Sequence, residues 1–409
     1  MEVIASCCAG IDVHQRFLVV CLSRIEAGQR HKEIRTFRHE TPDLLALRAW
    51  LLQAGCTHVG MESTGVYWMP VYRRLESCFE VVVANAQHIK AVPGRKTDVQ
   101  DAEWIADLLQ HGLLPASFVP NQEQQDLRDL TRLRVSLVQE RTRLVNRVHK
   151  VLEEAGLKLS TVLSDIMGVS GRAILQGLCA GESDPVQLAR RMRPGVKATE
   201  AQVVVALSGE LREHHRLLLR ELLSLIDAQN RSITHLEQEL ERRLAPLEEQ
   251  IERCAHITGV SRQTVQLLLA EVGSTLARFP DAEHLSSWAG VCPGQKESAG
   301  KRLSGRSKPG NRYVRAALVQ AAHGVRRTNT YLGERYRRLK KRRGSKRAAL
   351  AVGHSILVIY YHLMTTGQEY QEKGAEFFQR TDRAKVERQL IERIERLGYH
   401  VTRRPQPAA

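Results

Sequence analysis

The chain has 409 residues, more than the roughly 250–300 that one hydrophobic core accommodates, so its length predicts two or three domains. The composition, 43% hydrophobic and 26% charged, is typical of a soluble globular protein, and no apolar run is expected to reach the roughly 18 residues of a membrane span. An acidic start, Met1-Glu2, without a long apolar run after it argues against a secretory signal. We therefore expect a cytoplasmic protein with no membrane partner.

Residues 8–120 alternate short β-rich runs with helical patterns. In chain order they predict strands 9–13, 17–22 and 33–38, helix 42–54, strand 58–62, helix 66–76, strand 80–84 and helix 98–111. The first two strands should form a hairpin around a polar turn. This βββαβαβα order predicts an α/β domain over residues 1–120, with helices packed on a mixed sheet.

Two long helical patterns dominate residues 121–250 and predict a coiled-coil region. Apolar residues repeat every seven positions in each helix: Leu130, Leu137, Leu144 and Val151, widened by Leu133 and Val148, in residues 122–155, and Ile226, Ile233 and Leu240 in residues 210–244. The two helices could pair within one chain or between chains. The stretch between them, about 157–200, carries no recognisable chemistry and is interpreted as a packing insertion.

The remaining sequence predicts a mainly helical C-terminal domain, residues 251–368, and a charged helical tail, residues 369–409. Within it we expect a Gly/Ser/Lys/Arg loop at 290–311, followed by helices near 312–327, 331–343 and 348–364. Residues 254–273 resemble a helix-hairpin-helix that would offer backbone N–H groups to a phosphate, but an ordinary packing corner fits equally well.

The net positive charge of the chain comes from one segment of this C-terminal part. Residues 296–347 hold 18 Lys and Arg against two Glu, a surplus of 16 that equals the net charge of the whole chain. Neutralised phosphates release condensed counterions, so this segment predicts binding of a polyanion such as nucleic acid. A solvated basic helix face is the alternative interpretation.

Four carboxylates in the N-terminal domain predict a shared metal site. Asp12 lies in a strand between apolar residues, where an unpaired charge is costly, and Glu62 ends a later strand. Asp98 and Asp101 are three residues apart at a helix start and hence lie on one helix face. Hard divalent cations prefer such oxygens, so we expect Mg²⁺. Taken singly, Asp98 and Asp101 would be read as a helix cap and a first-turn charge.

The order of strands and acids resembles the RNase H-like fold of RuvC-type resolvases, and nearly all of residues 8–365 resemble the DEDD transposases, the insertion-sequence family numbered one hundred and ten. The matching motifs are Gly10-Ile11-Asp12-Val13-His14, Met61 through Trp68, Val92 through Ala102, Trp288 through Gly294, Glu297-Ser298-Ala299-Gly300-Lys301-Arg302 and Lys308-Pro309-Gly310-Asn311-Arg312.

This resemblance implies a RuvC-like domain that binds metal through the four acids and a transposase domain whose catalytic serine is Ser298. It also implies a recombinase guided by a structured bridge RNA, whose loops pair with target and donor DNA. The partners would be double-stranded DNA, that RNA and further copies of the chain, as a dimer or tetramer with a site shared between protomers. Expected nucleic-acid contacts are Arg95, Lys96, Lys296, Lys301, Arg302, Arg306, Lys308, Asn311, Arg312, Arg315, Arg337, Arg338, Lys340, Lys341, Arg342 and Arg343.

A serine nucleophile suits recombination for a chemical reason. A serine ester of a DNA phosphate conserves the energy of the phosphodiester bond for strand rejoining, whereas hydrolysis loses that energy to water. From the residues alone Ser298, Ser304 and Ser307 are equivalent candidates, and only the resemblance selects Ser298. Two other functions remain open at this stage. One is a RuvC-like, structure-specific endonuclease that uses water as nucleophile, and the other is a non-catalytic RNA- or DNA-binding protein with an inactive RNase H-like domain.

Overall fold

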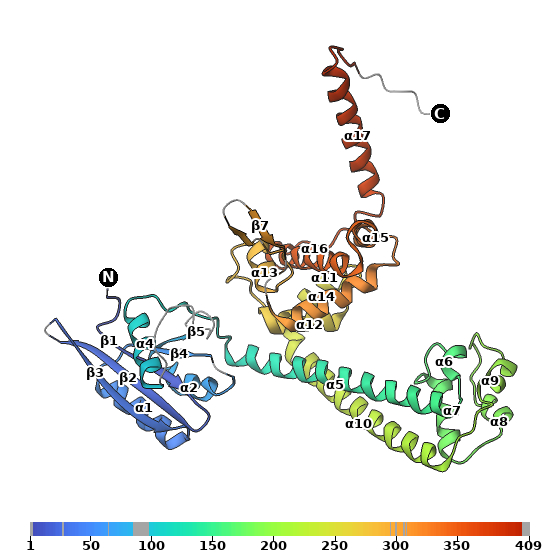
Figure 1. Cartoon of the computed structure of the whole chain (residues 1–409), viewed down its shortest axis with the longest axis horizontal. Helices are drawn as coiled ribbons and strands as arrows, with labels where there is room; N and C mark the ends of the chain where they lie inside the picture. The colour runs from blue at the N-terminus through green and yellow to red at the C-terminus, as the bar shows by residue number, and fades with distance from the viewer. Residues whose placement is uncertain are drawn as a thin grey trace. The chain divides into compact units, whose positions relative to one another are not determined.

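The computed structural model describes residues 3–26, 28–63, 65–84, 98–294, 296–298, 301–305, 307 and 309–402, with only the backbone described at 98, 99, 296–298, 301–304, 379–386 and 389. The chain divides into two compact units, residues 1–121 and 122–409. The first unit is a mixed α/β structure and the second is mainly helical (Figure 1). The predicted combination of an α/β part and a helical part is therefore confirmed.

A five-stranded mixed sheet forms the centre of the N-terminal unit, with strand order β3-β2-β1-β4-β5. The strands are β1 (Cys7–Val13), β2 (Phe17–Glu26), β3 (Gln29–Arg38), β4 (His58–Glu62) and β5 (Glu80–Ala84). β2 is antiparallel to both β1 and β3, whereas β4 is parallel to β1 and β5 is parallel to β4. The predicted β1–β2 hairpin and the order of strands are confirmed.

Helices cover both faces of this sheet. They are α1 (Thr41–Gln53), α2 (Trp68–Leu75) and α4 (Asp98–Gln110). Ile11 and Met61 pack in one core with Leu47 of α1 and other residues, while Cys8 packs in a second core with Ile105 of α4. Successive side chains of a strand point to opposite faces. β1 is therefore buried on both sides, which explains its almost uninterrupted apolar sequence.

The helical unit begins with two long antiparallel helices. They are α5 (Gln122–Glu154) and α10 (Glu213–Leu244). Arg134 pairs with Glu237 at 2.5 Å, and Nη1 of Arg141 donates to Oδ1 of Asn230 at 3.0 Å. Later residues of α5 thus pair with earlier residues of α10, so the two helices run antiparallel, as Figure 1 also shows. The two predicted long helices pair within one chain.

Most of the predicted apolar seam of this helical pair is buried. Leu144, Val148, Ile226 and Leu240 are buried, but Leu133 is 50% exposed. The prediction that Leu133 widens the seam is wrong. Its neighbour Arg134 faces α10 instead, and consecutive residues of a helix point about 100° apart.

A small helical lobe caps the far end of the pair. It comprises α6 (Leu159–Val162), α7 (Val169–Cys179), α8 (Pro185–Ala189) and α9 (Glu200–Ala206). Its apolar residues, among them Ile174 and Val203, share one core with Val148 of α5 and Leu219 of α10. The lobe therefore packs on the helical pair, in agreement with its interpretation as a packing insertion.

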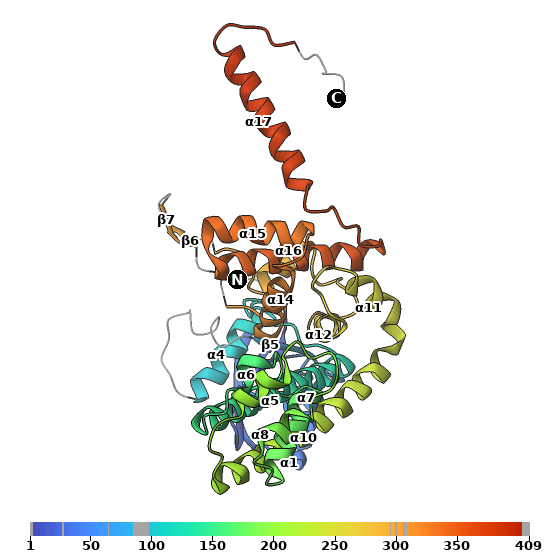
Figure 2. The ribbon, with the colours of Figure 1, turned by 90° about the vertical axis from the view of Figure 1, so that its right-hand side faces the viewer.

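The rest of the second unit is a compact helical subdomain followed by a tail helix. Its elements are a 3-10 turn η1 (Ala245–Leu247), α11 (Glu248–Ala255), α12 (Arg262–Val272), α13 (Ala282–Trp288), β6 (Lys296–Ser298), β7 (Lys301–Ser304), α14 (Arg312–Val325), α15 (Tyr331–Arg343), α16 (Ser345–Thr366) and α17 (Phe377–Glu395). The three predicted helices after residue 311 are confirmed, and Figure 2 shows α15 and α16 side by side. The segment predicted as a loop contains the β6–β7 hairpin.

Helix α16 corrects one expectation about membranes. By length and composition it could span a membrane, with a mean hydropathy of 1.4 over its most apolar window, so the expectation that no segment reaches this limit is wrong. Val352, Ile356 and Tyr360 of α16 are buried against α14 and α15 in the core of the subdomain. This burial is typical of the central helix of a globular core.

Candidate active site

Asp12 and Glu62 occupy equivalent positions on neighbouring parallel strands. The β1–β4 register ends at Ile11 opposite Met61, and the next residue on each strand is an acid. Ile11 and Met61 point into the core under α1, so the two carboxylates emerge on the opposite face. Parallel strands lie about 4.8 Å apart. The Asp12 side chain is only 13% exposed, and Glu62 is half-buried.

Helix α4 crosses this same face of the sheet, and Gly10 makes the crossing possible. A Cβ at Gly10 would lie 2.2 Å from the carbonyl oxygen of Ala102 and 2.3 Å from the nitrogen of Ala106, so only glycine fits. Further along the helix, Nε2 of Gln110 donates to the carbonyl of Ala5 at 3.3 Å. α4 therefore runs against the direction of β1, and its first turn lies at the Asp12 end of the strand.

That first turn carries the other two predicted acids. Asp101 immediately precedes Ala102 and is exposed, and Asp98 is the first residue of α4. The side chain of Asp98 lies outside the described residues. Among the described side chains, no three His, Cys, Asp or Glu residues form a group that could hold a metal ion. The fold thus brings Asp12, Glu62 and the start of α4 to one sheet edge, where their donors are the hard oxygens that Mg²⁺ prefers.

His14 belongs to this edge, although sequence reasoning gave it no role. Its Nε2 lies 2.9 Å from Oδ2 of Asp12, and its ring centroid lies 4.6 Å from that of Phe17. His14 follows Asp12 by two residues, a spacing that keeps both side chains on one face of an extended chain. That spacing was the available signal.

Ser298 lies at the end of a short hairpin in the second unit. It is the last residue of β6 and pairs with Lys301 of β7; its side chain lies outside the described residues. The two ends of the segment that carries the hairpin are held together. A Cβ on Gly310 would lie 2.3 Å from the nitrogen of Gly290, and the nitrogen of Asn311 donates to the carbonyl of Trp288 at 3.3 Å. The hairpin therefore projects from a closed base.

Comparison with known proteins identifies both regions. Residues 9–156 match a family model described as a transposase, DEDD_Tnp_IS110, and residues 252–337 match a model described as the transposase IS116/IS110/IS902 family. A probable family 20 transposase of Pseudomonas aeruginosa is 30% identical over 333 residues, covering 77% of this chain and 79% of that protein. The transposase for insertion sequence element IS1111A of Coxiella burnetii is 27% identical over 328 residues, covering 78% and 80%.

The chain belongs to the IS110 family of transposases. It is therefore an enzyme that cuts and rejoins DNA. The first matched region contains the acidic sheet edge, and the second contains the β6–β7 hairpin. Between them, residues 157–251 hold the small helical lobe and the whole of α10, which neither family model covers.

The transposase uses Asn311 inside its own fold. Oδ1 of Asn311 accepts from the backbone nitrogens of Tyr313 and Val314 and so caps α14. Its Nδ2 donates to Oε2 of Glu271 at 2.7 Å. The side chain predicted to bind nucleic acid is thus hydrogen-bonded at both ends within the transposase.

Glu271 is the centre of a buried ionic cluster that ties α5 to the C-terminal subdomain. The carboxylate has no exposed surface and accepts two hydrogen bonds from Arg132, at 2.7 and 2.8 Å. These bonds raise the pKa of Arg132, whereas burial lowers the pKa of the adjacent Arg128. Arg128 also donates to the backbone carbonyls of Ala270 and Glu271. The sequence alone gave no signal for this cluster.

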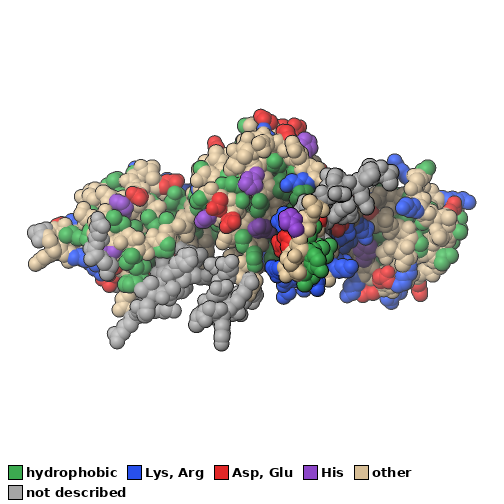
Figure 3. All heavy atoms as spheres, turned by 90° about the horizontal axis from the view of Figure 1, so that it is seen from above, with side chains coloured by type: hydrophobic (Ala, Val, Ile, Leu, Met, Phe, Trp, Pro, Cys, Tyr) green, Lys and Arg blue, Asp and Glu red, His purple; other side chains and the backbone are tan. Residues whose placement is uncertain are grey.

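The other predicted nucleic-acid contacts differ in their exposure and in the contacts that they make within the chain. Arg337 pairs with Glu334 at 2.9 Å and donates to the carbonyl of Thr328, and Arg338 lies over the ring of Phe378. Arg312 donates to the hydroxyl of Tyr313, and Arg315 is half-buried. Lys340, Lys341, Arg342 and Arg343 are exposed in the last turn of α15, where the helix dipole favours positive charge. Figure 3 shows basic side chains gathered beside exposed hydrophobic ones right of the centre of the view.

Several predicted contacts fall outside what the structure describes. Arg95, Lys96, Arg306 and Lys308 lie outside the described residues, and so do the side chains of Lys296, Lys301 and Arg302.

The turn after α11, which resembles part of a helix-hairpin-helix in sequence, is described. A Cβ on Gly259 would lie 2.3 Å from Cγ1 of Val325, so this turn packs against α14. That contact favours the packing corner over the helix-hairpin-helix.

Proposed function

We propose that this transposase moves its insertion sequence by attacking DNA with the hydroxyl of Ser298, assisted by a divalent metal at the acidic sheet edge and guided by a structured RNA. The observation that carries the proposal is the β1–β4 register, which places Asp12 beside Glu62 at the edge where α4 starts. Such an edge suits phosphoryl transfer because it concentrates carboxylates where a cation can bind a phosphate oxygen.

An RNase H-like fold for the N-terminal unit is part of this proposal. The strand order β3-β2-β1-β4-β5, with an antiparallel β1–β2–β3 meander and parallel β4 and β5, supports it. So do the acids at the ends of β1 and β4 and on the helix that covers them. Asp12, Glu62, Asp98 and Asp101 would hold Mg²⁺ there. The bound metal would favour deprotonation of the nucleophile and stabilise the leaving oxygen.

The serine step conserves the energy of the broken phosphodiester bond in a phosphoserine ester. The Ser298 oxygen forms a bond to phosphorus while the bond from phosphorus to one deoxyribose oxygen breaks, and the serine proton passes to that leaving oxygen. A hydroxyl of another DNA strand can then displace the serine by the reverse chemistry, so rejoining needs no external energy source. The closed base of the β6–β7 hairpin supports this role because it fixes the segment that presents Ser298.

Guidance by an RNA agrees with the distribution of charge. A protein that delegates sequence choice to base pairing needs to bind phosphate backbones rather than read bases. Residues 296–347 carry the net positive charge, and the last turn of α15 exposes four cations. The proposed complex contains target and donor DNA, the guide RNA and a dimer or tetramer of the chain, in the prokaryotic cytoplasm where DNA is accessible.

Covalent trapping separates this proposal from a RuvC-like nuclease that uses water. The transposase is incubated with its RNA, Mg²⁺ and end-labelled DNA, then denatured, and protein-linked label is measured. We expect an adduct that Ser298→Ala abolishes together with cleavage, while Ser304→Ala and Ser307→Ala retain it. Cleavage by Ser298→Ala at the normal rate would establish water as the nucleophile. Loss of the adduct in Ser304→Ala or Ser307→Ala alone would instead move the nucleophile to that serine.

A further inference from the structure

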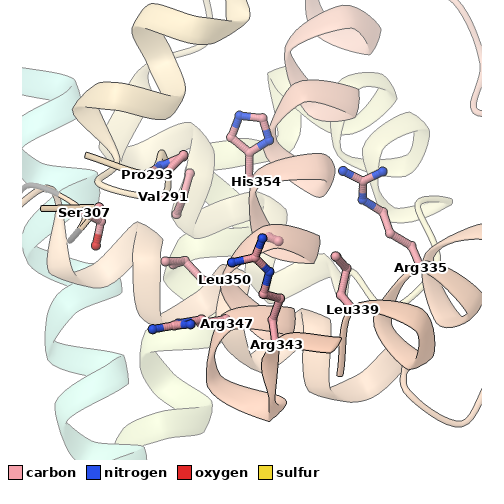
Figure 4. A pocket seen from close by; sticks show the side chains of 11 residues that line it. Val291, Pro293, Ser307, Arg335, Leu339, Arg343, Arg347, Leu350 and His354 are labelled. Atoms are coloured by element: carbon pink, nitrogen blue, oxygen red, sulfur yellow. The ribbon is translucent and has the colours of Figure 1, made fainter. Parts of the chain in front are cut away.

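A pocket lies directly behind the base of the β6–β7 hairpin. It has a volume of about 960 Å³, within the range of small-molecule sites, and we call it the arginine pocket after Arg335, Arg343 and Arg347. In the view of Figure 4, Arg347 lies on the side of Ser307 and Arg335 on the opposite side, with Arg343 and His354 between them. Only Arg343 among these arginines was predicted as a nucleic-acid contact.

The pocket combines cations with an apolar floor. Leu339, Leu350 and Ala351 line it together with the three arginines. Guanidinium groups bind phosphate oxygens in a fork geometry, while flat apolar surfaces receive the face of a base. A duplex keeps its base faces stacked inside, so a concave pocket of this composition fits an unpaired nucleotide better than paired DNA.

Arg335 and His354 add polar groups to the lining of the pocket. Nε of Arg335 is buried and forms no hydrogen bond to any described residue, which is unusual for a buried donor. Burial lowers the pKa of His354, and the charge of Arg335 acts in the same direction. A neutral imidazole beside guanidinium groups can accept a hydrogen bond or stack on a base.

The hairpin connects the pocket to the proposed chemistry. Val291 and Pro293 precede β6, and Gly305 and Ser307 follow β7, so both ends of the hairpin contribute to the pocket wall. With a rise of about 3.3 Å per residue, Ser298 at the hairpin end lies roughly 10–15 Å along the strands from this wall. A DNA strand advances by about 3.4 Å per nucleotide in a duplex and by more when it is extended, so this distance corresponds to a nucleotide about two to four positions away on the same strand.

We propose that the arginine pocket binds one unpaired DNA nucleotide about two to four positions from the phosphate that Ser298 attacks. Its arginines hold the phosphate of that nucleotide, and Leu339, Leu350 and His354 surround the base. The pocket thereby selects DNA whose strands have been locally separated. The assignment rests on the proposed function, because the choice of DNA over other nucleic acids depends on Ser298 of the hairpin attacking DNA.

The test measures binding alone, with full-length Ser298→Ala so that no strand is cut. Two DNA duplexes of equal length are compared by fluorescence anisotropy: one is fully paired, and the other has a single unpaired 2-aminopurine nucleotide. We expect the second duplex to bind about tenfold more tightly, equivalent to about 1.4 kcal/mol, because its unpaired base gains a stacking contact that a paired base lacks. The emission of 2-aminopurine should change on binding as its base leaves water.

Three variants in the same background locate the effect. Arg347→Gln removes an exposed pocket charge, and Ala351→Leu fills the pocket without changing charge. Both should reduce the preference for the unpaired nucleotide to nearly one. Lys346→Gln is the matched control, because Lys346 is the exposed neighbour of Arg347 and does not line the pocket; it should keep the preference. Melting temperatures verify folding, and Arg347→Gln suffices if Ala351→Leu is unstable.

Each other outcome would overturn the assignment. Equal binding of the two duplexes, or an unchanged preference in both pocket variants, would show that no nucleotide enters the pocket. An RNA duplex with the same unpaired nucleotide that binds more tightly than the DNA would assign the pocket to RNA. Because no step requires cleavage, failure of the serine mechanism would be seen as a missing covalent adduct and not in these affinities.

Discussion

Asn311 and Glu271 are joined by a 2.7 Å hydrogen bond from Nδ2 to Oε2, and through it the cap of α14 is connected to a fully buried carboxylate. Arg132 of α5 holds the same carboxylate through two further bonds. One acid thus fixes three segments that are distant in sequence: α5, α12 and the start of α14. This joint sits directly after the loop that carries the β6–β7 hairpin.

The first prediction concerns the stability of this joint. Glu271→Ala should lower the free energy of unfolding by about 3 kcal/mol, because it leaves Arg132 and Arg128 without their anionic partner. Urea denaturation followed by circular dichroism measures the change. Glu249→Gln is the control, since that carboxylate pairs with Arg253 but is 86% exposed. Equal, small effects of both substitutions would contradict a structural role for Glu271.

The second prediction concerns the acidic sheet edge. Asp12→Asn and Asp101→Asn should each abolish DNA cleavage and leave RNA binding intact, because the amide keeps the shape and removes the charge that would hold Mg²⁺. Chelation of divalent metal should have the same effect on the unaltered protein. Gel assays of cleavage and RNA binding measure both properties.

A matched control lies on the same helix as Asp101. Asp107 of α4 pairs with Arg30 and Lys32, nearer the other end of the helix. Asp107→Asn should therefore keep cleavage. If Asp101→Asn cleaved as well as Asp107→Asn, Asp101 would be only a first-turn helix charge.

Sequence patterns predicted the elements of the N-terminal unit closely because its strands and helices have strong, distinct periodicities. They also predicted which acids would share an edge, since the end of β1, the end of β4 and the start of α4 follow from topology. They missed His14 and Glu271. The contact of His14 with Asp12 depends on side-chain direction, and the buried cluster joins residues about 140 positions apart, which no local pattern encodes.

The third prediction tests the crossing of α4 over β1. Gly10→Ala should destabilise the first unit by at least about 1–3 kcal/mol, because its new methyl group meets backbone atoms of Ala102 and Ala106 that no side-chain rotation can move. The helix must shift, and its first turn moves away from Asp12. Cleavage per folded molecule should therefore fall as well. It is measured at a temperature where the variant remains folded.

Gly324→Ala provides the contrast for this experiment. The nearest atoms to a Cβ at Gly324 lie 3.8 Å away, and the residue is inside α14. Alanine favours a helix by about 1 kcal/mol over glycine, so this variant should be as stable as the original or more so. Normal cleavage by Gly10→Ala would show that the position of α4 does not control the site.

The fourth prediction concerns the exposed cations of α15. Lys340, Lys341 and Arg342 are exposed and follow one another in its last turn, whereas Arg337 and Arg338 already contact Glu334 and Phe378. Substituting Lys340, Lys341 and Arg342 together with Glu should weaken binding of duplex DNA. Each lost phosphate contact should reduce the slope of log affinity against log salt by about 0.9, so the slope should become shallower by about 2.7 if all three contact phosphates.

The control for this charge reversal changes the same number of cations in the small helical lobe. Arg190, Arg193 and Lys197 are exposed there, in a segment with no predicted chemistry, and their reversal alters the net charge of the chain by the same amount. Equilibrium titrations between about 50 and 200 mM salt give the slope for each variant. If the two triple variants showed the same slope, the effect would come from net charge alone, and α15 would present only a solvated basic face. A slope that changes in the α15 variant alone would place DNA phosphates against the last turn of that helix.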